Sequence, residues 1–139
     1  MQHLTTELIA LCDYAMLDKT NKLSVIGIFN ELNVVTFPGG LPSAFFVATL
    51  VGESNTEYEL IVTVRDEEKK DIFPPLTLKT KTSFTGKNNL VINIGNFVFP
   101  RAGEYTLRIA EQDKEIGSTV VHVLHAKQSE QKYEYKQPN

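Results

Sequence analysis

The side chains in this sequence with the greatest potential for chemistry are one cysteine, three histidines and a group of carboxylates. A thiol becomes a nucleophile when a nearby base activates it. Cys12 is the only cysteine, and because it stands in an apolar run that starts at Leu8, we expect a small core residue and not a reactive thiol. The sequence has no Gly-x-Ser-x-Gly elbow, no phosphate-binding glycine loop and no Cys-x-x-Cys pair. It therefore predicts no catalytic residue and no cofactor.

Two groups of side chains are candidates for metal ligands. His122 and His125 fall on opposite faces of a regular strand, so they are not expected to share an ion. The carboxylates of residues 66–71, together with Asp13 and Asp18, could offer oxygens to calcium. Lys69 and Lys70 lie inside that cluster and would oppose a divalent cation. A solvated hairpin tip is thus favoured, with calcium as the alternative, and no metal site is predicted.

Composition limits the class of protein. The chain has 139 residues, 42% of them hydrophobic, which is enough for one domain with one core. Its 14 basic and 17 acidic residues give a net charge of -3, so neither nucleic acid nor a membrane surface is expected as a partner. A single cysteine allows no intramolecular disulfide, and the N-terminus lacks the pattern of a secretion signal. We therefore expect a cytoplasmic protein.

Most of the chain follows strand patterns that must position these side chains. The alternation is clearest from Glu57 to Arg65, and Leu76 to Thr82 has the lysines of an edge strand. Leu23 to Phe29 is apolar on both faces, which predicts a central strand. The prolines and glycines from Phe37 to Pro42 predict irregular structure, and Gly95-Asn96 predicts a β-bulge that redirects Phe97 and Phe99. Further strands are expected over 7–14, 44–51 and 88–99, with 33–37 extending or kinking the strand at 23–29.

A sharp corner is predicted before the last hairpin. Pro100 and Gly103 set the corner, and Tyr105, Leu107 and Ile109 then point to one side of a strand. A tyrosine in this place can bury its ring and return its hydroxyl to the backbone, as in the tyrosine corner of immunoglobulin-like domains.

The sequence therefore predicts an all-β protein, an immunoglobulin-like or C2-like antiparallel β-sandwich of about eight strands. A barrel is the second choice. The domain is expected over residues 1–126, followed by a polar C-terminal tail over 127–139.

Apolar residues in loops are the candidates for a partner surface. Phe37, Leu41 and Phe73 lie in segments that should run along the surface, where exposed apolar groups often mark contacts. They could equally fold inward and close the ends of the sandwich. Tyr133 and Tyr135 stand in the polar tail and could anchor it to a neighbouring subunit, since aromatic side chains are common at interfaces.

Three short motifs carry a resemblance to a known family. The motifs are Cys12-Asp13-Tyr14-Ala15, Lys22-Leu23-Ser24-Val25-Ile26-Gly27 and Pro100-Arg101-Ala102-Gly103-Glu104-Tyr105. In this order and spacing the chain resembles an uncharacterised family of bacterial single-domain proteins. The resemblance implies no activity, cofactor or site residue, because none is established for that family.

Two functions follow as hypotheses. The first is a non-enzymatic protein-interaction or assembly module, which self-associates or docks on a protein partner by an exposed strand edge and the apolar loops. The alternative is a small-ligand or metal-binding protein, with hydrolytic activity as an option, whose site would combine an apolar wall with convergent polar side chains.

Overall fold

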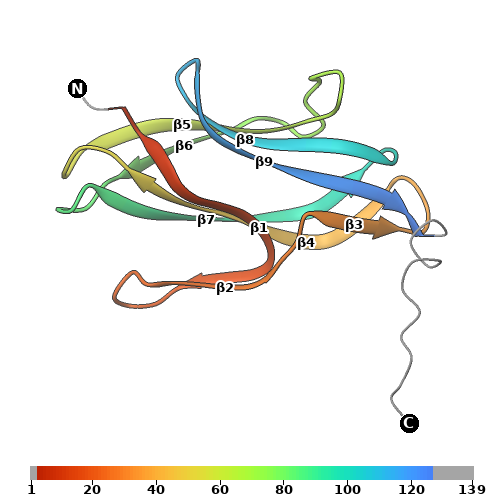
Figure 1. Cartoon of the computed structure of the whole chain (residues 1–139), viewed down its shortest axis with the longest axis horizontal. Helices are drawn as coiled ribbons and strands as arrows, with labels where there is room; N and C mark the ends of the chain where they lie inside the picture. Colours follow the sequence, from red (N-terminus) through yellow and green to blue (C-terminus); the bar gives the residue numbers. More distant parts are fainter. Residues whose placement is uncertain (1–2, 127–139) are drawn as a thin grey trace, which may run out of the picture.

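The computed structural model describes residues 3–126, in which nine β-strands form two sheets packed face to face (Figure 1). The strands are β1 (Thr5–Leu17), β2 (Leu23–Ile28), β3 (Glu31–Val34), β4 (Gly39–Val51), β5 (Glu57–Arg65), β6 (Leu76–Lys81), β7 (Lys87–Phe99), β8 (Gly103–Glu111) and β9 (Lys114–His125). One sheet has the strand order β2-β1-β4-β7 and the other the order β3-β9-β8-β5-β6. Neighbouring strands run antiparallel, except for the parallel pair β3 and β9. The protein is thus an all-β, immunoglobulin-like sandwich, as predicted.

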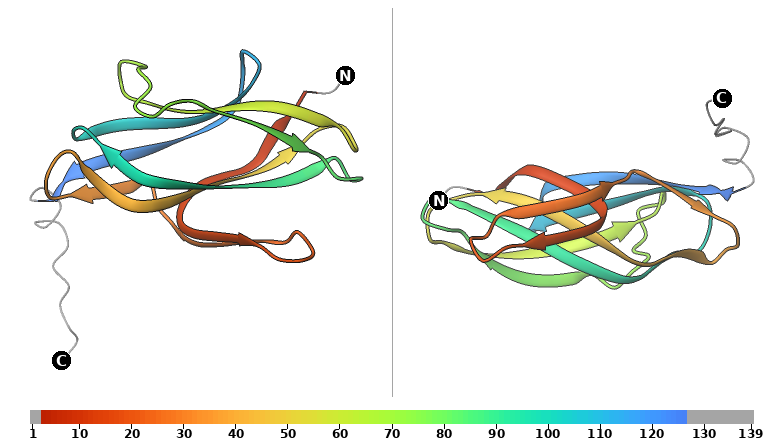
Figure 2. Two further views of the ribbon diagram at one scale, coloured as in Figure 1. Left: turned by 180° about the vertical axis from the view of Figure 1, so that it is seen from behind. Right: turned by 90° about the horizontal axis from the view of Figure 1, so that it is seen from below.

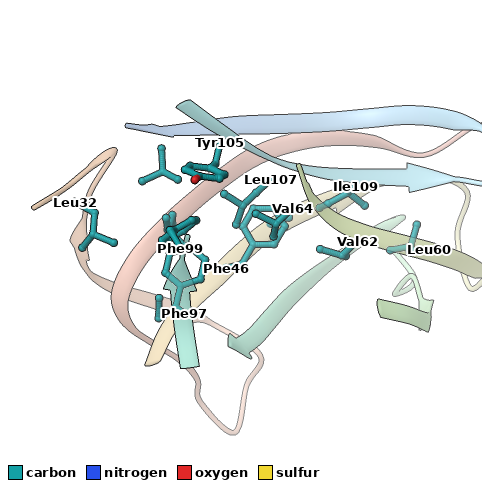
Figure 3. Close-up of a cluster of buried hydrophobic side chains, with 14 of the residues drawn as sticks. Leu32, Phe46, Leu60, Val62, Val64, Phe97, Phe99, Tyr105, Leu107 and Ile109 are labelled. Carbon is teal, nitrogen blue, oxygen red and sulfur yellow. The ribbon is translucent and has the colours of Figure 1, made fainter. Parts of the chain in front are cut away.

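The main core lies between the two sheets and follows from strand alternation. Leu60, Val62 and Val64 of β5 point inward as the sequence predicts, and β8 contributes Leu107 and Ile109 from the neighbouring strand. At one end the core is aromatic, where Phe46, Phe97, Phe99 and Tyr105 are fully buried (Figure 3). Burial of such side chains is the main source of stability for a domain of this size.

The tyrosine corner is confirmed. The ring of Tyr105 is buried and lies 4.6 Å from that of Phe99, centroid to centroid. Its hydroxyl donates a hydrogen bond of 2.7 Å to the backbone oxygen of Arg101. Because burial disfavours the phenolate, the pKa of Tyr105 is raised. This contact fixes the turn between β7 and β8.

Two predictions about the first third of the chain are wrong. The strand over 23–29 is not central: β2 forms the free edge of its sheet, and Ile26 and Ile28 are 61% and 65% exposed. Nor does the next segment extend it. Residues Glu31–Val34 instead form a separate strand in the other sheet, parallel to β9. The alternation of apolar and polar residues shows which face of a strand is apolar, but it does not show which sheet the strand joins. The change of sheet between β2 and β3 was therefore not predicted.

The region around Pro42 also differs from the prediction. β4 begins at Gly39, inside the segment expected to be irregular, because Gly40 and Leu41 pair with Val98 and Phe97 of β7. No bulge interrupts this pairing, since the register between β4 and β7 stays constant. Phe97 and Phe99 are nevertheless redirected, as predicted, and the structure places both in the core. Core-facing positions change from even to odd numbers across Asn96, which has a positive φ of 51°.

Candidate functional site

The β1–β2 hairpin stands away from the body of the sandwich (Figure 2). It does so because β1 changes partner along its length. Residues Thr5 to Cys12 pair with β4, and Cys12 also pairs with Ile28 of β2, whereas Tyr14 to Leu17 pair only with β2. The hairpin therefore leaves the plane of the four-stranded sheet and lies over its outer face.

A second, smaller core holds the hairpin against the outer face of β4 and β7. Its buried members are Ala10, Cys12, Ala15 and Val47. Leu23 and Val25 of β2 pack against this cluster from the hairpin side, and Phe45 and Val91 from the sheet side. The hairpin is thus a packed element and not a free loop.

The turn of the hairpin is ordered by Asp18. Its carboxylate accepts hydrogen bonds from the backbone N–H groups of Thr20 and Lys22, at 2.7 and 3.0 Å. Hydrogen bonds to the ionised form lower the pKa of Asp18, that from Lys22 most of all. The side-chain amide of Asn89, on β7, donates a further bond to the backbone oxygen of Asn21. The turn of the hairpin is therefore held against β7.

The hairpin also exposes large apolar side chains. Tyr14 and Met16 of β1 are 48% and 44% exposed, and they lie opposite Ile26 and Ser24 of β2. Ile26 and Ile28 continue the same surface along the free edge. We call Tyr14, Met16, Ile26 and Ile28 the hairpin patch. Contiguous exposed apolar groups on a protein surface typically mark a contact site.

The edge strand β2 also lacks the charged residues that usually protect such an edge. The two sheets have four edge strands. Three of them contain a charged residue: Glu31 in β3, Lys79 and Lys81 in β6, and Lys87 in β7. β2, with the sequence LSVIGI, contains none. An apolar, uncharged edge is a template for pairing with another strand.

The loop residues predicted as a partner surface lie partly in the core. Phe37, Leu41 and Phe73 are half-buried and pack against the main cluster. The Phe73 ring is 5.9 Å from that of Phe97 and 6.1 Å from that of Phe99. These contacts give the three residues a structural role, and their part in partner binding stays a prediction. Tyr133 and Tyr135 lie outside the described residues.

The sulfur of Cys12 is enclosed in the second core. The side chain is fully buried, and Sγ lies 3.5 Å from the backbone oxygens of Tyr14 and Phe45. Burial raises the pKa of the Cys12 thiol, because the thiolate would lose its hydration. The thiol is therefore a packing group with low nucleophilicity in the folded protein.

The acidic cluster of residues 66–71 is engaged in contacts within the protein. Asp66 accepts the backbone N–H groups of Glu68 and Lys70, both at 2.9 Å, and pairs with Arg101 at 3.0 Å. The N–H of Lys70 contributes most to lowering the pKa of Asp66. A carboxylate oxygen of Glu67 accepts the N–H of Glu104. These carboxylates thus order the turn after β5 and brace it against the tyrosine corner.

The two histidines of β9 have separate surroundings. His122 is exposed, with Nδ1 4.0 Å from a carboxylate oxygen of Glu104. The His125 ring lies 6.2 Å from that of Phe37. Across residues 3–126, no three His, Cys, Asp or Glu side chains are grouped so that they could hold a metal ion. Within the same range, no helix is long and apolar enough to cross a membrane.

The hairpin patch was not predicted from the sequence, although a signal was present. Ile26 and Ile28 alternate with the inward-facing Val25 and Leu23 in a segment without charge. That pattern fits a central strand as well as an unprotected edge. Only the position of β2 in the sheet separates these two cases.

Comparison with solved structures identifies the same fold in larger proteins. A β-glucosidase from Listeria innocua, in complex with isofagomine, is 11% identical with a TM-score of 0.52, over 88% of this chain and 16% of that one. A GH3 β-glucosidase from Bifidobacterium adolescentis is 11% identical with a TM-score of 0.50, over 88% and 17%. This chain therefore spans about a sixth of the length of these enzymes. An immunoglobulin-like protein from Pseudomonas aeruginosa is 13% identical with a TM-score of 0.49, over 87% and 96%.

Sequence comparison places the chain in a family. No curated protein sequence matches it. A family model does match, over residues 7–124, which include the first hairpin and the tyrosine corner. The predicted resemblance to an uncharacterised family is thereby confirmed, and the chain belongs to the family of unknown function DUF6941.

Proposed function

We propose that this domain is a non-enzymatic protein-binding module that accepts a strand of another chain at the free edge of β2. The observation that carries the proposal is the combination of an unprotected edge with exposed apolar side chains on one hairpin. An added strand would form main-chain hydrogen bonds with β2, and its side chains would cover Ile26 and Ile28. The added strand belongs either to a second copy of this chain or to a different protein.

The packing of the hairpin supports this proposal. An edge that receives a strand must be ordered before binding, because ordering it on binding would lower the affinity. The second core fixes one face of the hairpin, and Asn89 holds its turn. The hairpin patch is therefore presented on a supported element.

The remaining parts of the proposal concern partners and compartment. A net charge of -3 supplies little attraction for nucleic acid or anionic lipid, so the partner is proposed to be a protein. The protein is proposed to act in the cytoplasm, where a single thiol such as Cys12 stays reduced.

The test uses lysine substitutions at the edge. Ile26→Lys and Ile28→Lys change exposed side chains, so we expect unfolding midpoints close to that of the unmodified protein. Lysine is a residue that protects natural edges, so each variant should lose binding. Phe84→Lys is the matched control, because Phe84 is 82% exposed in the turn before β7 and is not part of the hairpin patch.

The readout combines affinity purification at native abundance, mass spectrometry and light scattering of the purified protein. The proposal is supported by a dimer, or by a stoichiometric partner, that the edge variants lose and Phe84→Lys retains. A partner that survives both edge substitutions would refute the assignment to β2. A monomer that captures nothing would refute the binding module itself.

A further inference from the structure

A hollow of about 430 Å³ lies on the outer face of the five-stranded sheet, between β5 and the turn that joins β8 to β9. Ile61 and Thr63 of β5 and Ala110 of β8 form its floor, and Pro75 contributes to one side. The polar side chains around it are Arg65, Asp71, Arg108, Gln112 and Asp113. The hollow is built from two paired strands and does not overlap the hairpin patch.

The position of these residues follows from the core. Leu60, Val62 and Val64 face the other sheet (Figure 3), so the residues between them, Ile61 and Thr63, face outward. Thr63 pairs directly with Arg108, and Ile61 with Ala110. Side chains so paired across two strands lie close together on one face.

The hydroxyl of Thr63 is the unusual group in this hollow. Thr63 is 3% exposed, and its Oγ1 has no hydrogen-bond partner among the described residues. A buried hydroxyl without a partner destabilises the folded state, so a folded protein rarely contains one. By contrast, the hydroxyl of the buried Thr80, on β6, accepts a hydrogen bond of 2.6 Å from the Asn88 amide. The unpaired group at the floor therefore points to a ligand that supplies the missing bond.

The two arginines next to Thr63 are already neutralised. Nε of Arg65 donates to Asp71 and Nε of Arg108 donates to Glu115, each at 3.0 Å. The two arginines and two aspartates around the hollow sum to zero charge. A phosphate or a dicarboxylate would have to compete with these carboxylates, so a strongly charged anion fits poorly. An uncharged ligand leaves both ion pairs in place.

Donors and acceptors are mixed around the hollow. Guanidinium groups donate, carboxylates accept, and the Gln112 amide and the Thr63 hydroxyl do both. A ligand hydroxyl also donates and accepts, so a ligand with several hydroxyls matches this arrangement. The apolar surfaces of Ile61, Pro75 and Ala110 suit the C–H face of a sugar ring. We propose that this hollow binds a small neutral carbohydrate, with the Thr63 hydroxyl as one of its hydrogen-bonding groups.

The test begins with binding to the full chain. Amide chemical shifts would be recorded during titration with glucose, galactose, mannose, N-acetylglucosamine and maltose. Each sugar is added up to about 20 mM, so that dissociation constants in the millimolar range are detected. Inorganic phosphate and glutamate serve as charged probes. We expect at least one sugar to shift the resonances of Thr63, Arg108 and Ala110 in a saturable way. Absence of any such shift, or shifts caused only by phosphate or glutamate, overturns the proposal.

Two threonine variants then separate binding from folding. Thr63→Val keeps the shape and removes the unpaired hydroxyl, so we expect a higher unfolding midpoint together with sugar binding weakened about tenfold or more. Thr80→Val removes a paired hydroxyl, so it should lower the midpoint and leave sugar binding unchanged. If Thr63→Val lowers the midpoint, its hydroxyl already has a partner. That outcome, or unchanged sugar binding by Thr63→Val, overturns the role given to Thr63.

Discussion

The side-chain amide of Asn89 donates a hydrogen bond of 3.0 Å to the backbone oxygen of Asn21, which joins β7 to the turn of the first hairpin. The amide is oriented by Thr49, whose hydroxyl donates to Oδ1 of Asn89 at 2.8 Å. This link spans residues that are far apart in the sequence. It connects the element that carries the hairpin patch to the far edge strand of the same sheet.

Removal of the Asn89 amide should loosen the hairpin turn. We expect Asn89→Ala to lower the free energy of unfolding by about 1 kcal/mol, the usual contribution of a hydrogen bond. Hydrogen exchange should accelerate over residues 18–23 more than in β5 or β8. Asn93→Ala is the control, because Asn93 is exposed on the same strand. Equal exchange in both variants would show that Asn89 does not hold the turn.

Loss of the Tyr105 hydroxyl should weaken the corner between β7 and β8. Tyr105→Phe keeps the buried ring but removes the donor to Arg101, so the free energy of unfolding should fall by about 1–1.5 kcal/mol. Urea unfolding measures the change. Tyr14→Phe is the matched control, because Tyr14 is half exposed. Its ring centroid lies 5.2 Å from that of Phe45. Equal stabilities of the two variants would contradict the prediction.

Native Cys12 should react slowly with thiol reagents. The side chain is buried and its pKa is raised, so both access and thiolate content are low. We expect an aromatic disulfide reagent to label Cys12 in urea but not in buffer at pH 8 over the same time. Mass spectrometry of the intact protein measures the labelled fraction. Rapid labelling in buffer would mean that the second core opens readily.

Acid should destabilise the protein partly through Asp66. Its pKa is lowered in the folded state, whereas an aspartate in an unfolded chain titrates at about pH 3.9. The unfolded state therefore binds more protons over this interval, and the stability due to Asp66 is present above pH 3.9 and lost as the pH falls through the folded pKa. We expect the unfolding midpoint of Asp66→Asn to depend less on pH between 5 and 2.5.

The control for this pH series is Asp113→Asn. The Asp113 carboxylate makes no hydrogen bond or ion pair with the described residues, so this substitution removes a carboxylate without removing a contact. If Asp66→Asn and the unmodified protein have the same slope, the contacts of Asp66 with Lys70 and Arg101 do not act on stability.

Local patterns predicted the parts of the fold that depend on neighbours along the chain. The alternation of β5 placed Leu60 and Val62 in the core, and Pro100, Gly103 and Tyr105 predicted the corner. The lysines of β6 predicted an edge strand. In each case the deciding contacts lie within one strand or one turn, so the sequence contains the information.

The candidate site could not be predicted in the same way. Whether Ile26 is central or exposed depends on which strand pairs with β2, and that pairing is decided by the bend of β1 after Cys12. The hollow on the other sheet depends on the register that sets Thr63 opposite Arg108. The exposure of Ile26 and the shape of the hollow both depend on pairing between strands. The alternation of hydrophobic residues along one strand does not determine that pairing.

The parallel pairing of β3 with β9 has a consequence for synthesis of the chain. Residues Glu31–Val34 find their partner strand only when residues 122–125 are available. On a ribosome, the four-stranded sheet can assemble once β7 has emerged, whereas β3 must wait for the last strand of the sandwich. The newly made protein should therefore pass through a stage in which one sheet is complete while Leu32 and Val34 are not yet packed, because β3 has no partner strand. A chaperone could bind the chain at this stage.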